Sequence, residues 1–222
     1  MSVTLVFMAG IVAVVIWWLL PQKLTSKPWL EHGPIEDPGP ATAAPPPTAK
    51  VGLWIFLAVV TSLFALFISA YSIRMELADW IPVPLPKVLW LNTGLLLLSS
   101  VAFQRTRNAA RVGRIEGVRL GLVAGGFFTF AFLAGQLWAW QQLEAAGYFA
   151  GSNPANAFFY LLTALHGLHL LGGLYVWGKT TARAWHDDVQ VKNVRLSVEL
   201  CTVYWHYLLL VWLVLFGLLL ST

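Results

Sequence analysis

The sequence predicts an all-α integral membrane protein: a five-helix transmembrane bundle preceded by one separate N-terminal transmembrane helix. Three observations support this class, namely the composition, the number of long apolar runs and the one-sided distribution of basic residues. Hydrophobic residues make up 58% of the 222 residues and charged residues only 11%. A soluble domain is about 45–50% apolar and about 25% charged, because its surface faces water. Most of this chain must therefore face lipid, or other protein within lipid.

Six apolar stretches are long enough to cross a bilayer. A helix rises about 1.5 Å per residue, so a hydrocarbon core of about 30 Å needs roughly 20 apolar residues. Backbone groups in lipid must bond within their own segment, so each stretch is predicted to be an α-helix. The third is short and needs Leu85 or Gln104 at its ends to cross the core. The stretches are residues 3–20, 51–73, 88–103, 120–143, 155–178 and 196–220.

The basic residues gather in alternate connections between these stretches. Segments 21–50, 104–119 and 179–195 carry twelve of the fourteen Lys and Arg residues, and the opposite loops hold only Arg74 and Lys87. Lys and Arg accumulate on the cytoplasmic side of membrane proteins. We therefore expect six helices with both termini on the outer side.

The chain is predicted to divide into three parts: an anchor at residues 1–22, a cytoplasmic linker at 23–49 and a five-helix core at 50–222. The first apolar run lacks a basic leading region and a small-residue cleavage site, so it is interpreted as an anchor rather than a signal peptide. Seven prolines between residues 28 and 47 predict an extended tether without a core of its own. The outer loop 79–86, with three further prolines, is expected to be stiff and non-helical.

Three histidines and one glutamate lie within the predicted spans. His166 and His169 are three residues apart, which places both imidazoles on one helix face. Glu199 and His206 are seven apart on the last span and share a face there. One interpretation is a metal or haem site, because paired histidines are common ligands. We favour hydrogen bonding between helices or to lipid headgroups, because intramembrane polar side chains pair with one another and the neighbouring glycines permit close helix approach.

Other polar residues are interpreted in the same way. Asn92 and Gln136 lie inside spans and are expected to bond across helices. Five arginines between residues 105 and 119 are expected to set topology or bind anionic headgroups. Their position beside two spans explains them without a nucleic-acid partner. The single cysteine, Cys201, excludes an internal disulfide framework and any multi-thiolate metal site. The five arginines are Arg105, Arg107, Arg111, Arg114 and Arg119.

Four blocks of this sequence, in order, carry a family resemblance. They are KVGLWIFLA at residues 50–58, LNTGLLLLSS at 91–100, FFYLLTALHGLHLLGG at 158–173 and VELCTVYWHY at 198–207. Together they resemble the haem-copper oxidase subunit III family, most closely bacterial cytochrome c oxidase subunit III. The third block, with its His-Gly-x-His pattern, is the most specific.

The resemblance implies a non-catalytic subunit of a proton-pumping oxidase in the bacterial cytoplasmic membrane. It implies haem and copper in partner subunits I and II, none in this chain, and no soluble substrate bound here. It also implies packing against subunit I, bound structural phospholipid and support of proton uptake and complex stability. Interhelical bonding and lipid contact are the implied roles of the interior polar positions His166, His169, Glu199, Tyr204, Trp205 and His206.

Two positions depart from the family pattern, and two alternatives stay open. The family usually has a glutamate where Val60 stands here, and many members have one where this chain has Ala139. The role of those carboxylates is therefore not carried over. One alternative is the equivalent subunit of a quinol oxidase or nitric-oxide reductase assembly. The other is a self-contained membrane haem or metal protein using His166, His169 and His206.

Overall fold

The computed structural model describes residues 48–186 and 191–221. The chain divides into two units, residues 1–48 and 49–222, and the account below concerns the second. The predicted anchor at residues 1–22, with its span 3–20, lies outside the described residues, as does nearly all of the predicted linker. A sixth helix and the positions of both termini therefore stay predictions.

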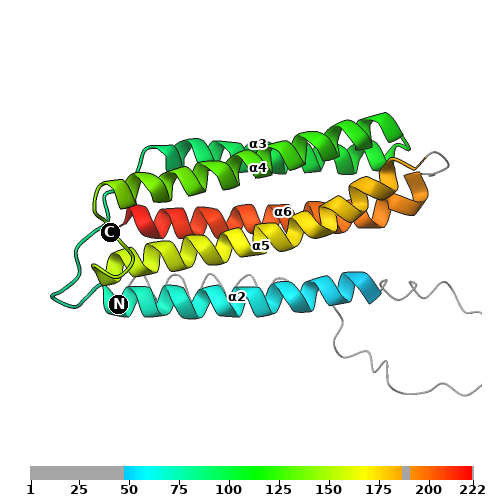
Figure 1. Ribbon diagram of the computed structural model, residues 1–222. Helices are drawn as coiled ribbons and strands as arrows, with labels where there is room; N and C mark the ends of the chain where they lie inside the picture. Colours follow the sequence, from blue (N-terminus) through cyan, green and yellow to red (C-terminus); the bar gives the residue numbers. More distant parts are fainter. Residues whose placement is uncertain (1–47, 187–190, 222) are drawn as a thin grey trace, which may run out of the picture. The chain divides into compact units, whose positions relative to one another are not determined.

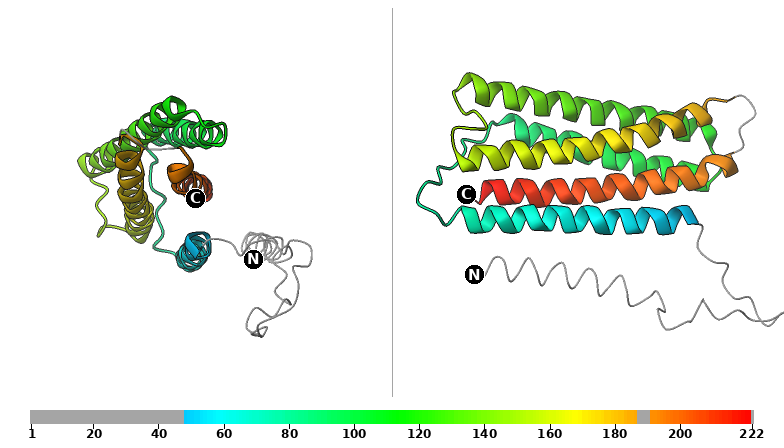
Figure 2. Two further views of the ribbon diagram at one scale, coloured as in Figure 1. Left: turned by 90° about the vertical axis from the view of Figure 1, so that its right-hand side faces the viewer. Right: turned by 60° about the horizontal axis from the view of Figure 1, so that its bottom comes forward.

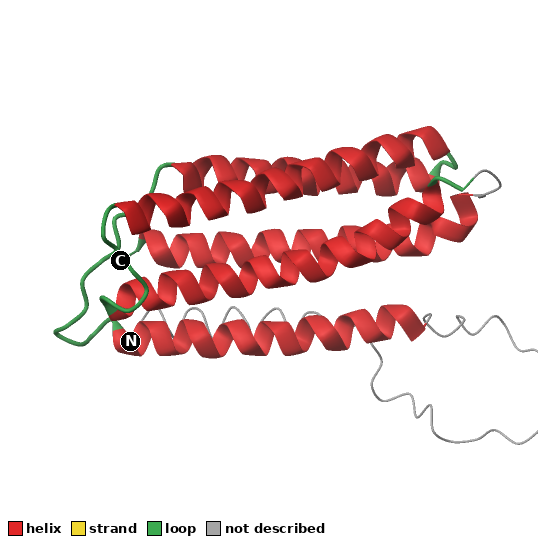
Figure 3. Cartoon of the chain, in the orientation of Figure 1, coloured by secondary structure: helices red, strands yellow, loops and turns green. Residues whose placement is uncertain are grey.

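The described residues form five α-helices and contain no strand (Figures 1 and 3). This confirms the all-α class. The helices are α2 (Thr48–Arg74), α3 (Val88–Arg111), α4 (Ile115–Ala145), α5 (Pro154–Ala184) and α6 (Val191–Leu220).

Four of these helices are long and apolar enough to cross a membrane. They are α2, α4, α5 and, over Val194–Leu220, α6. The 24-residue helix α3 is long enough but is not among the four. Its polar residues Asn92, Thr93, Ser99 and Ser100 lower its hydropathy, although all four are buried within the protein. The membrane character of the protein is confirmed, and the crossing by α3 stays a prediction.

The helices extend beyond the apolar runs that predicted them. Helix α3 continues to Arg111, so Arg105 and Arg107 are helical, and only residues 112–114 connect α3 to α4. The expectation that residues 104–119 form a loop is therefore wrong. Hydropathy marks the part of a helix that suits hydrocarbon, whereas backbone hydrogen bonding continues past it. Basic side chains near a helix C-terminus also favour such an extension.

Helices α3 to α6 form a ring in which each packs against two others. Helix α3 contacts α4 and α6, and α5 contacts the same two (Figure 2). Helix α2 joins this ring through side chains. Thr61 Oγ1 lies 2.9 Å from the Tyr207 hydroxyl of α6, and the ring of Phe64 packs on His169 of α5. The core thus lies inside the four-helix ring, and α2 covers part of α5 and α6.

Local sequence signals explain where α4 ends and α5 begins. After α4, Gly147 adopts a φ of 87°, and the amides of Gly147 and Tyr148 donate to the carbonyls of Glu144 and Leu143. This is the Schellman arrangement, which favours glycine at the residue with positive φ. The Asn153 side chain then accepts from the Ala155 amide and caps α5, with Pro154 in the first turn.

The connections formed by residues 75–87 and 146–153 are held to the bundle and to each other. Residues 80–86 contain no helix, as their prolines predict. Asn153 Nδ2 donates to the Ile81 carbonyl oxygen at 2.5 Å, joining the loop before α3 to the start of α5. Arg74 forms an ion pair with Asp79, and its hydrogen bond holds the pKa of that carboxyl below its usual value. Both connections are therefore positioned by specific bonds.

Candidate functional site

A chain of buried hydroxyl groups joins α3, α4 and α6. The indole nitrogen of Trp205 donates to Thr129 Oγ1 at 2.9 Å. Thr129 and Ser99 each reach the Gly125 carbonyl oxygen, at 2.8 and 2.9 Å. Thr129 and Ser99 are fully buried and Trp205 is almost so. Unpaired polar groups are costly in an apolar interior, so this network holds the three helices at one spacing.

Other tryptophans repeat the pattern between different helices. Trp212 of α6 donates to Thr93 Oγ1 of α3 at 2.9 Å, and Trp177 of α5 donates to the Leu122 carbonyl of α4 at 2.9 Å. Each large apolar ring thus fills the core while its single N–H bonds a specific partner. The described bundle is therefore held together by indole donors as well as by any histidine that bonds between helices.

His166 is fully buried and joins α5 to α6. Its Nε2 lies 3.1 Å from the Leu208 carbonyl oxygen, so this nitrogen is the donor. The ring packs against Trp212 and Phe132, with centroid distances of 5.2 and 5.7 Å. Its Nδ1 has no hydrogen-bond partner among the described residues. The imidazole is therefore a tightly packed interhelical link with one free lone pair.

His169 shares its helix with His166 but contacts a different neighbour. Its Nδ1 donates to the Leu165 carbonyl of its own helix at 2.7 Å, and its ring packs on Phe56 and Phe64 of α2. The interhelical bond at this position comes from Tyr204, whose hydroxyl donates to the His169 carbonyl oxygen at 2.8 Å. Three-residue spacing has therefore placed the two imidazoles towards different helices.

His206 and Glu199 have separate surroundings on α6. His206 is exposed, and its Nδ1 donates to the Thr202 carbonyl of its own helix at 2.8 Å. Glu199 pairs with Lys50 of α2 at 3.6 Å and with Arg195 at 3.5 Å. Within the described residues, no three His, Cys, Asp or Glu side chains are grouped closely enough to hold a metal ion. His166, His169 and His206 are thus not brought together there.

Asn92 and Gln136 meet in the buried space between α3 and α4. Asn92 Nδ2 donates to Gln136 Oε1 at 3.3 Å. In the described part of the chain, the remaining amide atoms, Asn92 Oδ1 and Gln136 Nε2, have no hydrogen-bond partner. Gly135 makes room for this pair, because a Cβ there would lie 2.1 Å from Asn92 Oδ1. A small residue beside a polar pair is the usual arrangement at close helix crossings in membranes.

The five arginines lie in three different settings. Arg105, Arg111 and Arg114 are exposed. Arg119 Nε donates to the Ala184 carbonyl at 2.9 Å, bonding the last residue of α5. Arg107 is half-buried and lines a pocket. The three exposed side chains are free to bind lipid headgroups or to set the topology. Arg119 instead bonds the end of a neighbouring helix.

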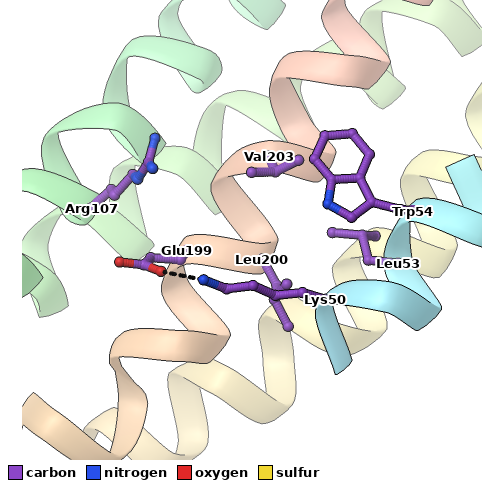
Figure 4. Close-up of a pocket in the computed structure, with 7 residues that line it drawn as sticks. All are labelled: Lys50, Leu53, Trp54, Arg107, Glu199, Leu200 and Val203. Carbon is purple, nitrogen blue, oxygen red and sulfur yellow. Dashed lines mark ion pairs between the residues drawn. The ribbon is translucent and has the colours of Figure 1, made fainter. Parts of the chain in front are cut away.

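The pocket lined by Arg107 lies between α2, α3 and α6, near the ends of these helices that carry most basic residues (Figure 4). It has a volume of about 260 Å³. Its lining includes one charged residue from each of the three helices and four apolar residues, and Lys50 pairs with Glu199 (Figure 4). The lining residues are Lys50, Leu53, Trp54, Arg107, Glu199, Leu200 and Val203.

The two positions where the family usually has glutamate are apolar and enclosed. Val60 is 2% exposed and Ala139 is fully buried. Helix packing closes both places, so neither offers a water-filled pocket for a carboxylate. Lys50, which lines the pocket, and Thr129, which bonds Trp205, were not among the predicted residues. Lys50 precedes the second apolar run and belongs to a basic segment, a signal that could have identified it.

The fold and the interior define a class of protein. A mostly apolar helical bundle that uses its buried polar groups for bonds between helices is typical of a structural membrane component. The sequence profile of the family described as "Cytochrome c oxidase subunit III" matches residues 42–220, which include every described helix. The chain belongs to this family.

Curated relatives agree with that assignment. The chain is 28% identical over 176 residues to "Cytochrome c oxidase subunit 3" of Synechocystis sp., covering 77% of this chain and 74% of the relative. It is 30% identical to "Probable cytochrome c oxidase subunit 3" of Mycobacterium tuberculosis, covering 77% and 86%. The subunit 3 of Thermostichus vulcanus is 26% identical over 202 residues, covering 85% and 96%.

Proposed function

We propose that this chain is a non-catalytic accessory subunit of a proton-pumping haem-copper cytochrome c oxidase in aerobic respiration. The observation that carries this proposal is the family match over residues 42–220. In this assembly the haems and copper reside in subunits I and II, and this chain packs against subunit I. Its contribution is to stabilise the complex and to sustain proton uptake.

The geometry of the interior supports a structural rather than a redox role. Trp205, His166 and Trp212 direct their N–H groups to oxygen atoms on neighbouring helices. Side chains that ligate a metal would instead point, three or four together, at the position of one ion. The polar groups described above stabilise a fixed arrangement of helices that a partner subunit can pack against.

Bound structural phospholipid is part of the proposal. Three arginines at the connected ends of α3 and α4 are exposed, and a fourth lines the pocket beside α2. Each basic residue near an anionic membrane surface contributes about 1 kcal/mol of attraction. The exposed apolar side chains of the bundle are suited to acyl chains or to a partner's helices.

The proposed location is the bacterial cytoplasmic membrane, with six spans and both termini on the outer side. Twelve of the fourteen basic residues fall in segments that six alternating helices place on one side. The excess of Lys and Arg identifies that side as cytoplasmic. A reporter fused to either terminus tests this topology, and cytoplasmic activity of the reporter would contradict it.

The proposal is tested by purifying the full-length tagged chain from its native membranes in mild detergent. We expect it to bring down the oxidase subunits, a haem absorption spectrum and oxygen consumption supported by reduced cytochrome c. Oxygen consumption with quinol alone would indicate a quinol oxidase. Nitric oxide consumption without oxygen consumption would indicate a reductase assembly. Recovery of the intact chain without any haem-containing partner would contradict the proposal.

A further inference from the structure

His206 lies in the middle of the membrane-spanning part of α6. That part runs from Val194 to Leu220, so the histidine is 12 residues after its start and 14 before its end. At about 1.5 Å per residue, each end is roughly 18–21 Å away. The hydrocarbon core extends only about 15 Å on either side of its mid-plane. The imidazole is therefore placed near the mid-plane, where no lipid headgroup reaches it.

The imidazole of His206 is exposed on the outside of the bundle and is only half satisfied. Its Nδ1 donates to the Thr202 carbonyl oxygen at 2.8 Å, and its Nε2 bonds no described residue. A charged ring is costly at this depth, so the ring is neutral and Nε2 is an acceptor. Hydrocarbon tails offer no donor to it. An acceptor in this position therefore favours a polypeptide neighbour that carries a donor.

The other polar groups at this level already have partners within the described bundle. The Tyr207 hydroxyl lies 2.9 Å from Thr61 Oγ1 of α2, and Thr61 in turn donates to its own helix. Ser62 is exposed but donates to the Ala58 carbonyl oxygen at 3.0 Å. His206 differs from these residues because a second polar atom of its side chain still needs a partner.

The residues that share the exposed face with His206 suit a packed helix. Leu210, Leu213 and Gly217 follow it at intervals of four, three and four residues, and all three are exposed. This is the heptad spacing with which two helices pack side by side. A Cβ at Gly217 would have open space around it, and a glycine on such a face lets another helix approach closely. We call His206, Leu210, Leu213 and Gly217 the outer stripe of α6.

We propose that the outer stripe of α6 packs against a transmembrane helix of a partner subunit, and that this helix donates a hydrogen bond to His206 Nε2. The donor is a hydroxyl, amide or indole side chain, as in the bond from Trp205 to Thr129 within this bundle. The inference rests on the proposed function in taking the partner to be an oxidase subunit, and it assigns the contact to one face of one helix.

The first test replaces the chromosomal copy of the full-length chain with tagged variants and measures the haem recovered per chain at increasing detergent concentration. His206→Leu removes the acceptor and keeps an apolar side chain, so we expect it to reduce recovery about fivefold, as the loss of one interhelical bond predicts. His206→Gln keeps an acceptor and should lie between the two. Ser62→Ala is the matched control, because that side chain is exposed at a similar depth and bonds its own helix.

The outcome of this test is decided by comparison with the control. Helical circular dichroism of each purified variant establishes that it is folded. Recovery by His206→Leu equal to that of the unchanged chain, or an equal loss in Ser62→Ala, would overturn the proposed contact.

The second test identifies the neighbour with a photoreactive residue in place of Leu210, one turn from His206. We expect an adduct with a transmembrane segment of an oxidase subunit, and a weaker adduct when His206→Leu is added. The same probe at Leu168, an exposed residue of α5, should not capture that segment. Adducts with lipid alone, adducts only within the chain, or equal capture of the segment from Leu168 would overturn the inference.

These results separate the inference from the proposed function. An oxidase that accompanies the chain regardless of His206 would overturn the inference and leave the proposed function intact. If no haem-containing partner accompanied the unchanged chain, the proposed function would fail. A Leu210 adduct with the transmembrane helix of another identified protein, lost in His206→Leu, would then still support the contact.

Discussion

His166 in α5 donates a hydrogen bond from Nε2 to the carbonyl oxygen of Leu208 in α6, across 3.1 Å. The histidine is fully buried, and its ring packs tilted against Trp212, one turn beyond Leu208. A single imidazole thus contributes both a directional bond and packing at the α5–α6 contact. The bond and the packing explain why a histidine that ligates no metal with described residues occurs within an apolar span.

Replacement of His166 by alanine should destabilise the bundle. The change removes the bond to Leu208 and leaves a cavity beside Trp212, and the two losses together amount to about 2–3 kcal/mol. Thermal unfolding in detergent, followed by circular dichroism, measures the effect. His206→Ala is the matched control, because that imidazole is exposed and bonds only its own helix. Equal destabilisation by the two variants would contradict the structural role of His166.

Thr129 is expected to stabilise the bundle through the hydrogen bonds of its hydroxyl group. Thr129→Val keeps the shape of the side chain but removes the acceptor for Trp205 and the bond to the Gly125 carbonyl. Leaving a buried indole N–H unpaired costs about 1–3 kcal/mol. The comparison is Thr180→Val, where the hydroxyl bonds its own helix and only weakly contacts Cys201 at 3.8 Å. Chemical unfolding should show a clearly larger loss for Thr129→Val, and a similar loss for both would argue against the network.

Gly126 allows α4 and α5 to approach closely. A Cβ at this position would lie 2.2 Å from Cζ2 of Trp177, whose indole is held by its bond to the Leu122 carbonyl. Gly126→Ala should therefore destabilise by about 1–3 kcal/mol through overpacking. Gly172→Ala has open space around the new methyl group and should be neutral or slightly stabilising. Thermal unfolding of the two variants decides the matter, and a neutral Gly126→Ala would show that the helices can separate freely.

Residues 1–40 are predicted to be dispensable for folding of the core. The chain divides at residue 48, and the polar contacts described for α2 to α6 lie within residues 49–222. The truncated chain, expressed in membranes and purified, should retain the helical signal and the cooperative unfolding of the full chain. Loss of cooperative unfolding on truncation would show that the N-terminal segment is part of the folding unit.

The helices could be located from the sequence, and so could their ends beside residues 75–87 and 146–153, which agree within two residues. The ends that carry the basic segments could not. An apolar run identifies the segment that suits hydrocarbon, and it placed α2, α4, α5 and α6 correctly. It missed the polar turns beyond, such as the C-terminal part of α3 with Arg107, because those residues are helical for reasons of hydrogen bonding rather than hydropathy. The hydropathy of α3 is also low, because its buried polar residues bond to other helices instead of facing lipid.

The partners of the site residues were less predictable than the residues themselves. Spacing along one helix gives the direction of a side chain, but the neighbour it meets depends on how the helices pack. His166 and His169 illustrate this, because one reaches α6 and the other packs on α2. The pair formed by Lys50 and Glu199 has no local signal at all, since the two residues lie near opposite ends of the folded core in sequence.

The most direct test of the account is a visible absorption spectrum and metal analysis of the chain, both within its native assembly and after separation from it. We expect haem absorption and metal to stay with the partner subunits, while the separated chain is folded, colourless and free of stoichiometric iron or copper. A separated chain that holds iron or copper stoichiometrically, and loses it in His169→Ala, would contradict the view that these imidazoles serve the packing of helices.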